Sequence, residues 1–151
     1  MHCPGSARHI AHRRKERSDK GKRHDQPEAR LQRACVAYLR QHACLAIGSA
    51  AGAKYQFGAK TAVAMKAKGL DPGQPDLLVL ERGVLGEPGL AVEFKIDTNE
   101  LSPEQRYWFK QLRQRGWRCA EVRTTDDFHH VLKSHLGRWL PPFGAVIEEL
   151  D

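Results

Sequence analysis

The chain has 151 residues, of which 40% are hydrophobic, and this is enough for one domain with its own core and no need of disulfides. Lysine and arginine (25) outnumber aspartate and glutamate (18), and the resulting net charge of +7 favours a polyanionic partner, nucleic acid ahead of an anionic membrane. No apolar run approaches about 18 residues, and the basic N-terminus lacks the apolar stretch of a signal peptide, so we expect a soluble, cytoplasmic protein.

Residues 1–26 are basic and almost free of apolar side chains, and we predict a disordered arm there. Its charge has two interpretations, a solvated tail or an arm that adds sequence-independent phosphate contacts. The folded domain is predicted over residues 27–137 and is followed by an extension, residues 138–151.

A helix is predicted from Pro27, because Leu31, Cys35, Tyr38 and Leu39 form one apolar stripe at helical spacing. Residues 47–73 are rich in alanine and glycine and favour a loop with a short helix near residues 61–68.

Three lysines of this second segment, Lys54, Lys60 and Lys66, are candidate nucleic-acid contacts. Two aromatic residues among them, Tyr55 and Phe57, either stack on bases beside these phosphate contacts or pack in the core. Both interpretations stay open on the sequence.

Two strands are predicted next, over residues 76–81 and 90–96, with residues 82–89 as a hairpin loop. In the second strand apolar and other residues alternate, so that Leu90, Val92, Phe94 and Ile96 face the core while Ala91, Glu93, Lys95 and Asp97 face the other way. The side chains of that second face are expected either to take part in catalysis or to be exposed to solvent.

A helix then begins with a capping box, in which Ser102 is the N-cap and Gln105 the N3 residue, and ends before Gly116. Residues 117–123 read as a strand, and Thr125 is expected to cap a last helix. Trp108 and Trp117 are expected in the core. The order predicts an α/β domain, a mixed α+β sheet of about four strands flanked by helices.

Neither the cysteines nor the histidines indicate a metal site. The cysteines Cys3, Cys35, Cys44 and Cys119 form no CxxC pair and no zinc-type spacing, so we expect reduced, mostly buried thiols. The adjacent His129 and His130 lie on a predicted helix, where neighbouring positions face different ways.

The acidic residues of the strands are the candidates for chemistry. Asp76 alone could simply end a turn, and Glu93 with Lys95, whose Cα atoms are about 6.6 Å apart, could form a surface salt bridge on an edge strand. If the strands pair as a hairpin, however, Asp76 and Glu93 converge on a site suited to Mg²⁺. Lys95 would then orient or deprotonate a water, or offset charge on a phosphate, which predicts metal-assisted phosphodiester hydrolysis.

Pro75-Asp76 followed by Glu93-Phe94-Lys95 resembles the PD-(D/E)XK nuclease signature. Three longer segments, KAKGLDPGQPDLLVL, LAVEFKID and LSPEQRYWFKQLRQRGWRCAEVRTTDDF, resemble the virus-type replication-repair nuclease (VRR-NUC) domain over residues 28–136. The resemblance implies a restriction-endonuclease-like core.

It also implies roles for individual residues. Asp76, Glu93 and the backbone carbonyl of Phe94 match metal ligands, and Lys95 matches the catalytic lysine. Gln105 matches an active-site glutamine, although it could serve only the capping box. Glu28 matches an acidic residue that contacts the metal, although a favourable interaction with the helix N-terminus would also explain it. The chain departs from the family at Ile47-Gly48-Ser49, where many members have an Asn-Gly pair.

The expected function is a Mg²⁺-dependent DNA endonuclease, with Mn²⁺ as a substitute and no small-molecule cofactor. The resemblance further implies a homodimer that acts on branched DNA such as four-way junctions, in phage or mobile-element replication and repair. The alternatives are a DNA-binding module that does not cut, and a nuclease that cleaves RNA.

Overall fold

The computed structural model describes residues 27–49 and 59–145. None of the helices in these two ranges is long and apolar enough to span a membrane. The helices are α1 (Pro27–Gln41), α2 (Ala59–Ala67), α3 (Pro103–Gln114) and α4 (Thr125–Leu136), and the strands are β1 (Ala46–Gly48), β2 (Leu77–Val79), β3 (Leu90–Phe94) and β4 (Arg118–Val122).

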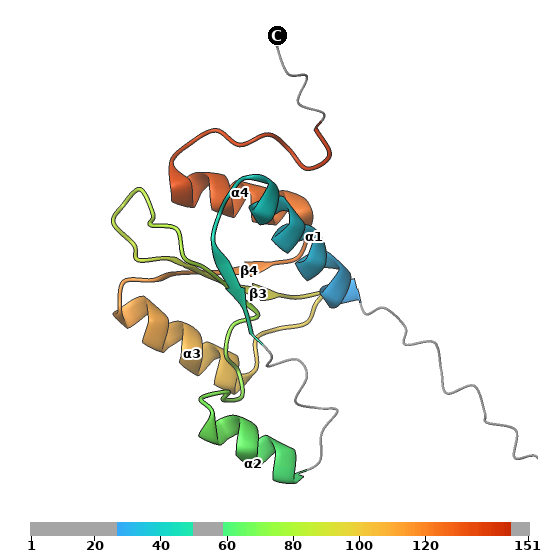
Figure 1. The fold of residues 1–151 in the computed structure, drawn as a ribbon, viewed down its shortest axis with the longest axis vertical. Helices are drawn as coiled ribbons and strands as arrows, with labels where there is room; N and C mark the ends of the chain where they lie inside the picture. Colours follow the sequence, from blue (N-terminus) through green and yellow to red (C-terminus); the bar gives the residue numbers. More distant parts are fainter. Residues whose placement is uncertain (1–26, 50–58, 146–151) are drawn as a thin grey trace, which may run out of the picture.

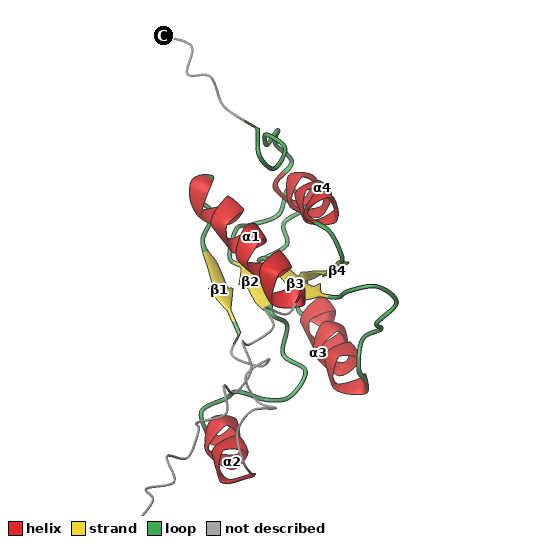
Figure 2. Ribbon diagram, turned by 90° about the vertical axis from the view of Figure 1, so that its right-hand side faces the viewer, coloured by secondary structure: helices red, strands yellow, loops and turns green. Residues whose placement is uncertain are grey.

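The strands form one mixed sheet in the order β1-β2-β3-β4, with β1 at one edge (Figure 2). β2 and β3 are antiparallel, with Leu77 opposite Val92, so the hairpin predicted from the sequence is confirmed. β3 and β4 are parallel and are connected through α3. This four-stranded sheet with flanking helices confirms the predicted fold class.

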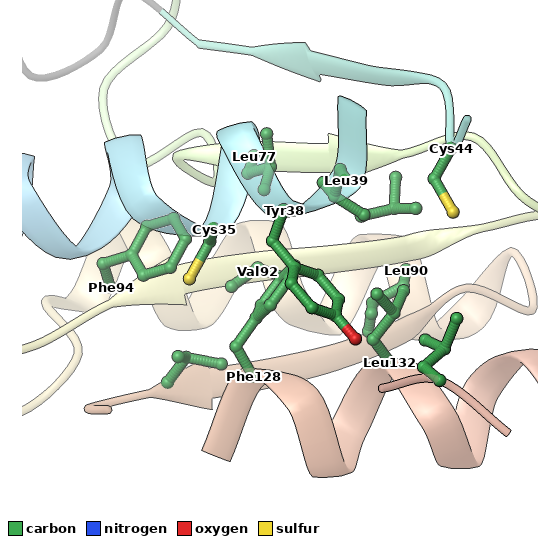
Figure 3. Packing of buried hydrophobic residues seen from close by; sticks show 13 residues of the cluster. Cys35, Tyr38, Leu39, Cys44, Leu77, Leu90, Val92, Phe94, Phe128 and Leu132 are labelled. Atoms are coloured by element: carbon green, nitrogen blue, oxygen red, sulfur yellow. The ribbon is translucent and has the colours of Figure 1, made fainter. Parts of the chain in front are cut away.

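Helices cover both faces of the sheet. Figure 1 shows α1 and α4 on one side and α3 on the other, while α2 lies apart from the sheet. The main core lies between the sheet and the pair α1 and α4, where α1 contributes its predicted stripe (Figure 3). Its largest fully buried side chains include Leu39, Leu77, Leu90, Phe94, Phe128 and Leu132.

The second face of β3 is buried, contrary to one of the two predictions for it. Ala91, Glu93 and Lys95 point away from the main core, yet only 0%, 3% and 9% of their surfaces are exposed. Residues of α3 such as the buried Phe109 cover this side. Because β3 lies between β2 and β4, a surface salt bridge on an edge strand is wrong for Glu93 and Lys95.

Helix ends follow the sequence signals with one correction. The capping box of α3 is present, with Ser102 as N-cap and Gln105 at N3. The N-cap of α4 is Thr124 and not Thr125, because the Thr124 hydroxyl accepts the hydrogen bond from the backbone N–H of Asp127. Either threonine fits the cap by residue type, and only the backbone geometry distinguishes them.

Other predictions need correction where packing decides. The strand β1 was not predicted, and the two tryptophans expected in the core, Trp108 and Trp117, are only half-buried. The Trp108 indole N–H donates to the Pro72 carbonyl oxygen at 3.1 Å, and the Trp117 ring covers Gly89, where a Cβ atom would lie 2.4 Å from the ring. Both rings therefore cover loops at the edge of the fold.

The cysteines that the structure describes are free thiols, as expected. Cys35 and Cys44 are buried and Cys119 is partly buried, while Cys3 lies outside the described residues. Burial raises the pKa of Cys35 to about 12, which makes this thiol a core residue and no nucleophile.

Candidate active site

The β2–β3 hairpin places two carboxylates together. Continuing the register by one position from Leu77 and Val92 sets Asp76 opposite Glu93. Asp76 Oδ2 accepts a hydrogen bond of 2.9 Å from the backbone N–H of Phe94. This bond turns the Asp76 side chain across the end of β3 and toward Glu93.

The backbone of Asp76 is held from two directions. Its carbonyl oxygen accepts one hydrogen bond from Gln32 Nε2 on α1 at 3.1 Å and another from the backbone N–H of Ser49 at 2.9 Å. Ser49, in the segment 47–49 where the sequence departs from the pattern that it otherwise resembles, therefore helps to fix Asp76. The sequence analysis did not identify Gln32 as a site residue. Its position one helical turn after Glu28, on the same side of α1, was a signal for it.

Lys95, Glu93 and Gln105 form a polar network on the α3 side of the sheet. Lys95 Nζ lies 3.4 Å from Glu93 Oε1 and donates to Gln105 Oε1 at 2.9 Å. Gln105 Nε2 in turn donates to Glu93 Oε1. Gln105 Oε1 also accepts from the backbone N–H of Ser102 at 2.8 Å, so Gln105 caps α3 and orients the network at the same time.

The loop between Lys95 and α3 is fixed by an arginine that sequence reasoning did not single out. Arg123 donates through Nη1 to the Asp97 carbonyl oxygen at 2.7 Å and through Nη2 to the Asn99 carbonyl oxygen at 2.8 Å. Asp97 has a φ of 52°, which an aspartate tolerates better than most residues. Arg123 thereby sets the spacing between Lys95 and Gln105.

The two carboxyls resist ionising together. Burial, followed by the negative charge of Asp76, raises the pKa of Glu93 to about 8. Burial also raises the pKa of Asp76, and the charge of Glu28 adds to this, while the Phe94 N–H and Lys95 oppose it. Glu28 lies in the first turn of α1, one helical turn before Gln32, whose side chain contacts the Asp76 backbone.

The donor set fits a hard divalent cation. With both groups ionised, the buried Glu93 Oε2 has no hydrogen-bond donor among the described residues. The same part of the chain has no cluster of three or more His, Cys, Asp or Glu side chains that could enclose a metal. A pair of carboxylates that leaves most positions to water and substrate oxygens is the kind of site that Mg²⁺ prefers.

The turn before Asp76 packs tightly against the first turn of α3. Gly73 has a φ of 80°, and a Cβ atom there would lie 2.4 Å from the backbone carbon of Glu104 and 2.7 Å from the backbone nitrogen of Gln105. The Trp108 hydrogen bond to Pro72 closes the same contact. The turn and the helix that carries Gln105 are therefore positioned by each other.

Gly73→Ala is expected to destabilise the protein by about 1–3 kcal/mol more than Gly69→Ala. Gly69 has almost the same φ, 81°, but no atom within 4 Å of its Cβ position, so the pair separates the steric clash from the backbone strain. Urea unfolding of both variants measures the difference. Equal losses would show that the turn and α3 do not constrain each other.

The structure gives no contact with the carboxylate pair for the other predicted site residues that it describes. Lys66 lies in the last turn of α2 and is exposed. Lys54, Tyr55 and Phe57 fall outside the described residues, and so does the side chain of Lys60. His129 Nε2 lies 3.0 Å from the Leu140 carbonyl oxygen, which gives this ring a structural partner.

A mixed sheet that brings the half-buried Asp76 together with the buried Glu93 and Lys95 is the arrangement that the sequence predicts for a nuclease core. The family model of the VRR-NUC domain matches residues 26–126, so the chain belongs to the VRR-NUC domain family, a family of nucleases. A solved structure of a "VRR_NUC domain protein" has a similar fold, with a TM-score of 0.54, 20% identity, and coverage of 72% of this chain and 86% of that one. Among curated proteins, none matches the chain significantly.

Proposed function

We propose that this protein is a divalent-metal-dependent endonuclease that hydrolyses phosphodiester bonds in DNA. The observation that carries the proposal is the pair formed by the half-buried Asp76 and the buried Glu93, both with raised pKa values. A bound cation would offset this charge repulsion and would give Glu93 Oε2 the partner that it lacks among the described residues. Membership of the VRR-NUC family and the net charge of +7 support a polyanionic substrate.

Asp76, Glu93 and the backbone carbonyl of Phe94 are the proposed ligands of a Mg²⁺ ion, for which Mn²⁺ would substitute. Glu28 is the proposed further contact, because its charge already acts on Asp76. Such an ion, once bound, lowers the pKa of a water and neutralises charge on the phosphate. Hydrogen bonds from Phe94, Gln32 and Ser49 keep Asp76 oriented for this contact.

Lys95 is proposed to act on the phosphate and on the attacking water. Its ammonium group, held by Glu93 and Gln105, is a fixed positive charge at the edge of the carboxylate pair. Because solvent has little access to Lys95, such a charge stabilises the negative charge that develops during attack, and it can orient the nucleophile. Gln105 contributes by keeping Lys95 and Glu93 in register and is a positioning residue in this scheme.

We extend the proposal to the substrate class on the strength of the family resemblance. Branched DNA, such as a four-way junction, presents pairs of strands related by two-fold symmetry. A homodimer with two equivalent sites matches that symmetry. The context that suits such an activity is phage or mobile-element replication and repair.

A cleavage panel tests the proposal. Wild-type protein and Asp76→Asn are incubated with four-way junction, flap, single-stranded and linear duplex DNA, and with RNA, in Mg²⁺, Mn²⁺ or EDTA. We expect metal-dependent cuts by the wild type, strongest on branched DNA, and none by the variant. Binding of every substrate without a cut in either metal would instead identify a DNA-binding module, and cuts confined to RNA would identify a ribonuclease.

A further inference from the structure

A second candidate binding surface lies at the C-terminal end of α4. A hollow of about 360 Å³ is formed there by the last turns of the helix and the chain that leaves it. We call this space the α4 hollow. It is lined by His130, Lys133, Ser134, Gly137, Arg138 and Trp139.

The α4 hollow is remote from the carboxylate pair. α4 begins just after the end of β4 that lies beside Phe94, and runs back along the sheet for 12 residues, about 18 Å. In Figure 1 the N-terminal end of α1, which carries Glu28, lies on the right, and the C-terminal end of α4 lies on the left. A ligand in the hollow is therefore not at the proposed site of cleavage.

The charges that line the hollow are positive. Lys133 and Arg138 are exposed, and Arg118 adds a guanidinium group whose Nη1 donates to Ser134 Oγ at 3.2 Å. No aspartate or glutamate is among the lining residues, and the ion pairs within the described residues involve neither Lys133 nor Arg138. Within the described residues, Arg138 Nη2 donates to the weak acceptor Cys44 Sγ at 3.8 Å. The hollow thus suits a polyanion.

An aromatic ring lies beside these cations. Trp139 is 71% exposed, whereas the other two tryptophans of the chain are half-buried. Proteins bind single-stranded nucleic acid by stacking bases on exposed aromatic rings and by contacting the adjacent phosphates with lysine and arginine. Both parts of that arrangement are present within one hollow, and a base inside an intact duplex could not use the ring.

We propose that the α4 hollow binds an unpaired stretch of DNA, with a base stacked on Trp139 and phosphates held by Lys133 and Arg138. The identity of the ligand as DNA rests on the proposed nuclease function. The distance from Asp76 and Glu93 means that the bound strand is a different part of the substrate from the phosphodiester that is cut. The hollow thereby favours substrates that carry single-stranded segments.

Binding of fluorescent oligonucleotides, measured by anisotropy in EDTA, tests this proposal. Trp139→Ala is expected to weaken binding of a short oligothymidylate roughly tenfold, but to leave unchanged the weaker binding of an abasic oligomer with the same number of phosphates. Lys133→Gln is expected to weaken both and to reduce the slope of log K against log salt by about 0.7. The charge-matched control Lys110→Gln, on α3 across the sheet, should leave all values near wild type.

Two results would overturn the proposal. One is that Trp139→Ala binds both oligomers as wild type does, or loses affinity equally for both, because neither pattern is stacking. The other is that Lys110→Gln reduces the salt slope as much as Lys133→Gln, because the contacts would then be spread over the whole surface. Since EDTA removes cleavage from the measurement, failure here and failure of the cleavage panel are distinguishable.

Discussion

Lys95→Met is expected to reduce DNA cleavage by about 10²- to 10⁴-fold while DNA binding persists. The substitution keeps an unbranched side chain in a position that is only 9% exposed but removes the ammonium group. That group lies 3.4 Å from Glu93 Oε1 and is the cation that the network directs at the carboxylate pair. Single-turnover cleavage in saturating Mg²⁺ or Mn²⁺ measures the effect on chemistry apart from binding.

Lys110→Met provides the matched control, because Lys110 is an exposed lysine of α3 and undergoes the same change in charge and size. Its cleavage rate should equal that of the wild type. Lys95→Arg should not restore the rate fully, because a planar guanidinium cannot replace a compact ammonium held between Glu93 and Gln105. Wild-type rates for Lys95→Met, with a folded spectrum, would remove Lys95 from the mechanism.

Glu93→Gln is expected to abolish cleavage and yet to stabilise the metal-free protein at alkaline pH. Glutamine has nearly the same shape but no charge, so two negative charges no longer lie beside each other at positions 76 and 93. The gain should be on the order of a few kcal/mol above pH 8, or roughly 5 °C or more in Tm. Thermal unfolding in EDTA from pH 5 to pH 9 measures it.

The pH dependence has a defined sign. The pKa of Glu93 rises from 4.5 to about 8 on folding, so the folded state binds more protons than the unfolded state between these values. The stability that this group contributes is complete below about pH 4.5 and is lost as the pH rises through about 8. The Tm advantage of Glu93→Gln should therefore grow from pH 5 to pH 9.

A carboxylate outside the network provides the control for this prediction. The Glu100 side chain is 82% exposed, and Glu100→Gln should shift Tm little at any pH in this range. Addition of Mn²⁺ should raise the Tm of the wild type and of Glu100→Gln but not of Glu93→Gln. If the Tm of Glu93→Gln equals that of the wild type at every pH in this range, burial beside Asp76 does not raise the pKa of Glu93.

The sequence was a good guide to elements whose signals are local. The apolar runs of β2 and β3, the turn before Asp76 and the capping box at Ser102 and Gln105 each lie within a few residues. β1 was missed because Ala46–Gly48 is three residues long and is stabilised by pairing with β2, which no local pattern encodes. The predicted N-cap of α4 was wrong by one residue, because Thr124 and Thr125 are equivalent by residue type.

The composition of the proposed site was predictable, but its burial and its supports were not. Alternation along β3 separated Glu93 and Lys95 from the core, yet it could not indicate that α3 covers them. That depends on how the loop held by Arg123 returns the chain to the sheet. Likewise the contact of Gln32 with Asp76 exists only because α1 docks at this end of β2.

Anomalous diffraction from crystals soaked in Mn²⁺ tests the central claim most directly. A peak is expected between the carboxylates of Asp76 and Glu93 in the wild type, and none is expected there in Glu93→Gln. Absence of the peak in the wild type at saturating Mn²⁺, or its presence only at another position, would contradict a metal-dependent nuclease site at this end of the sheet.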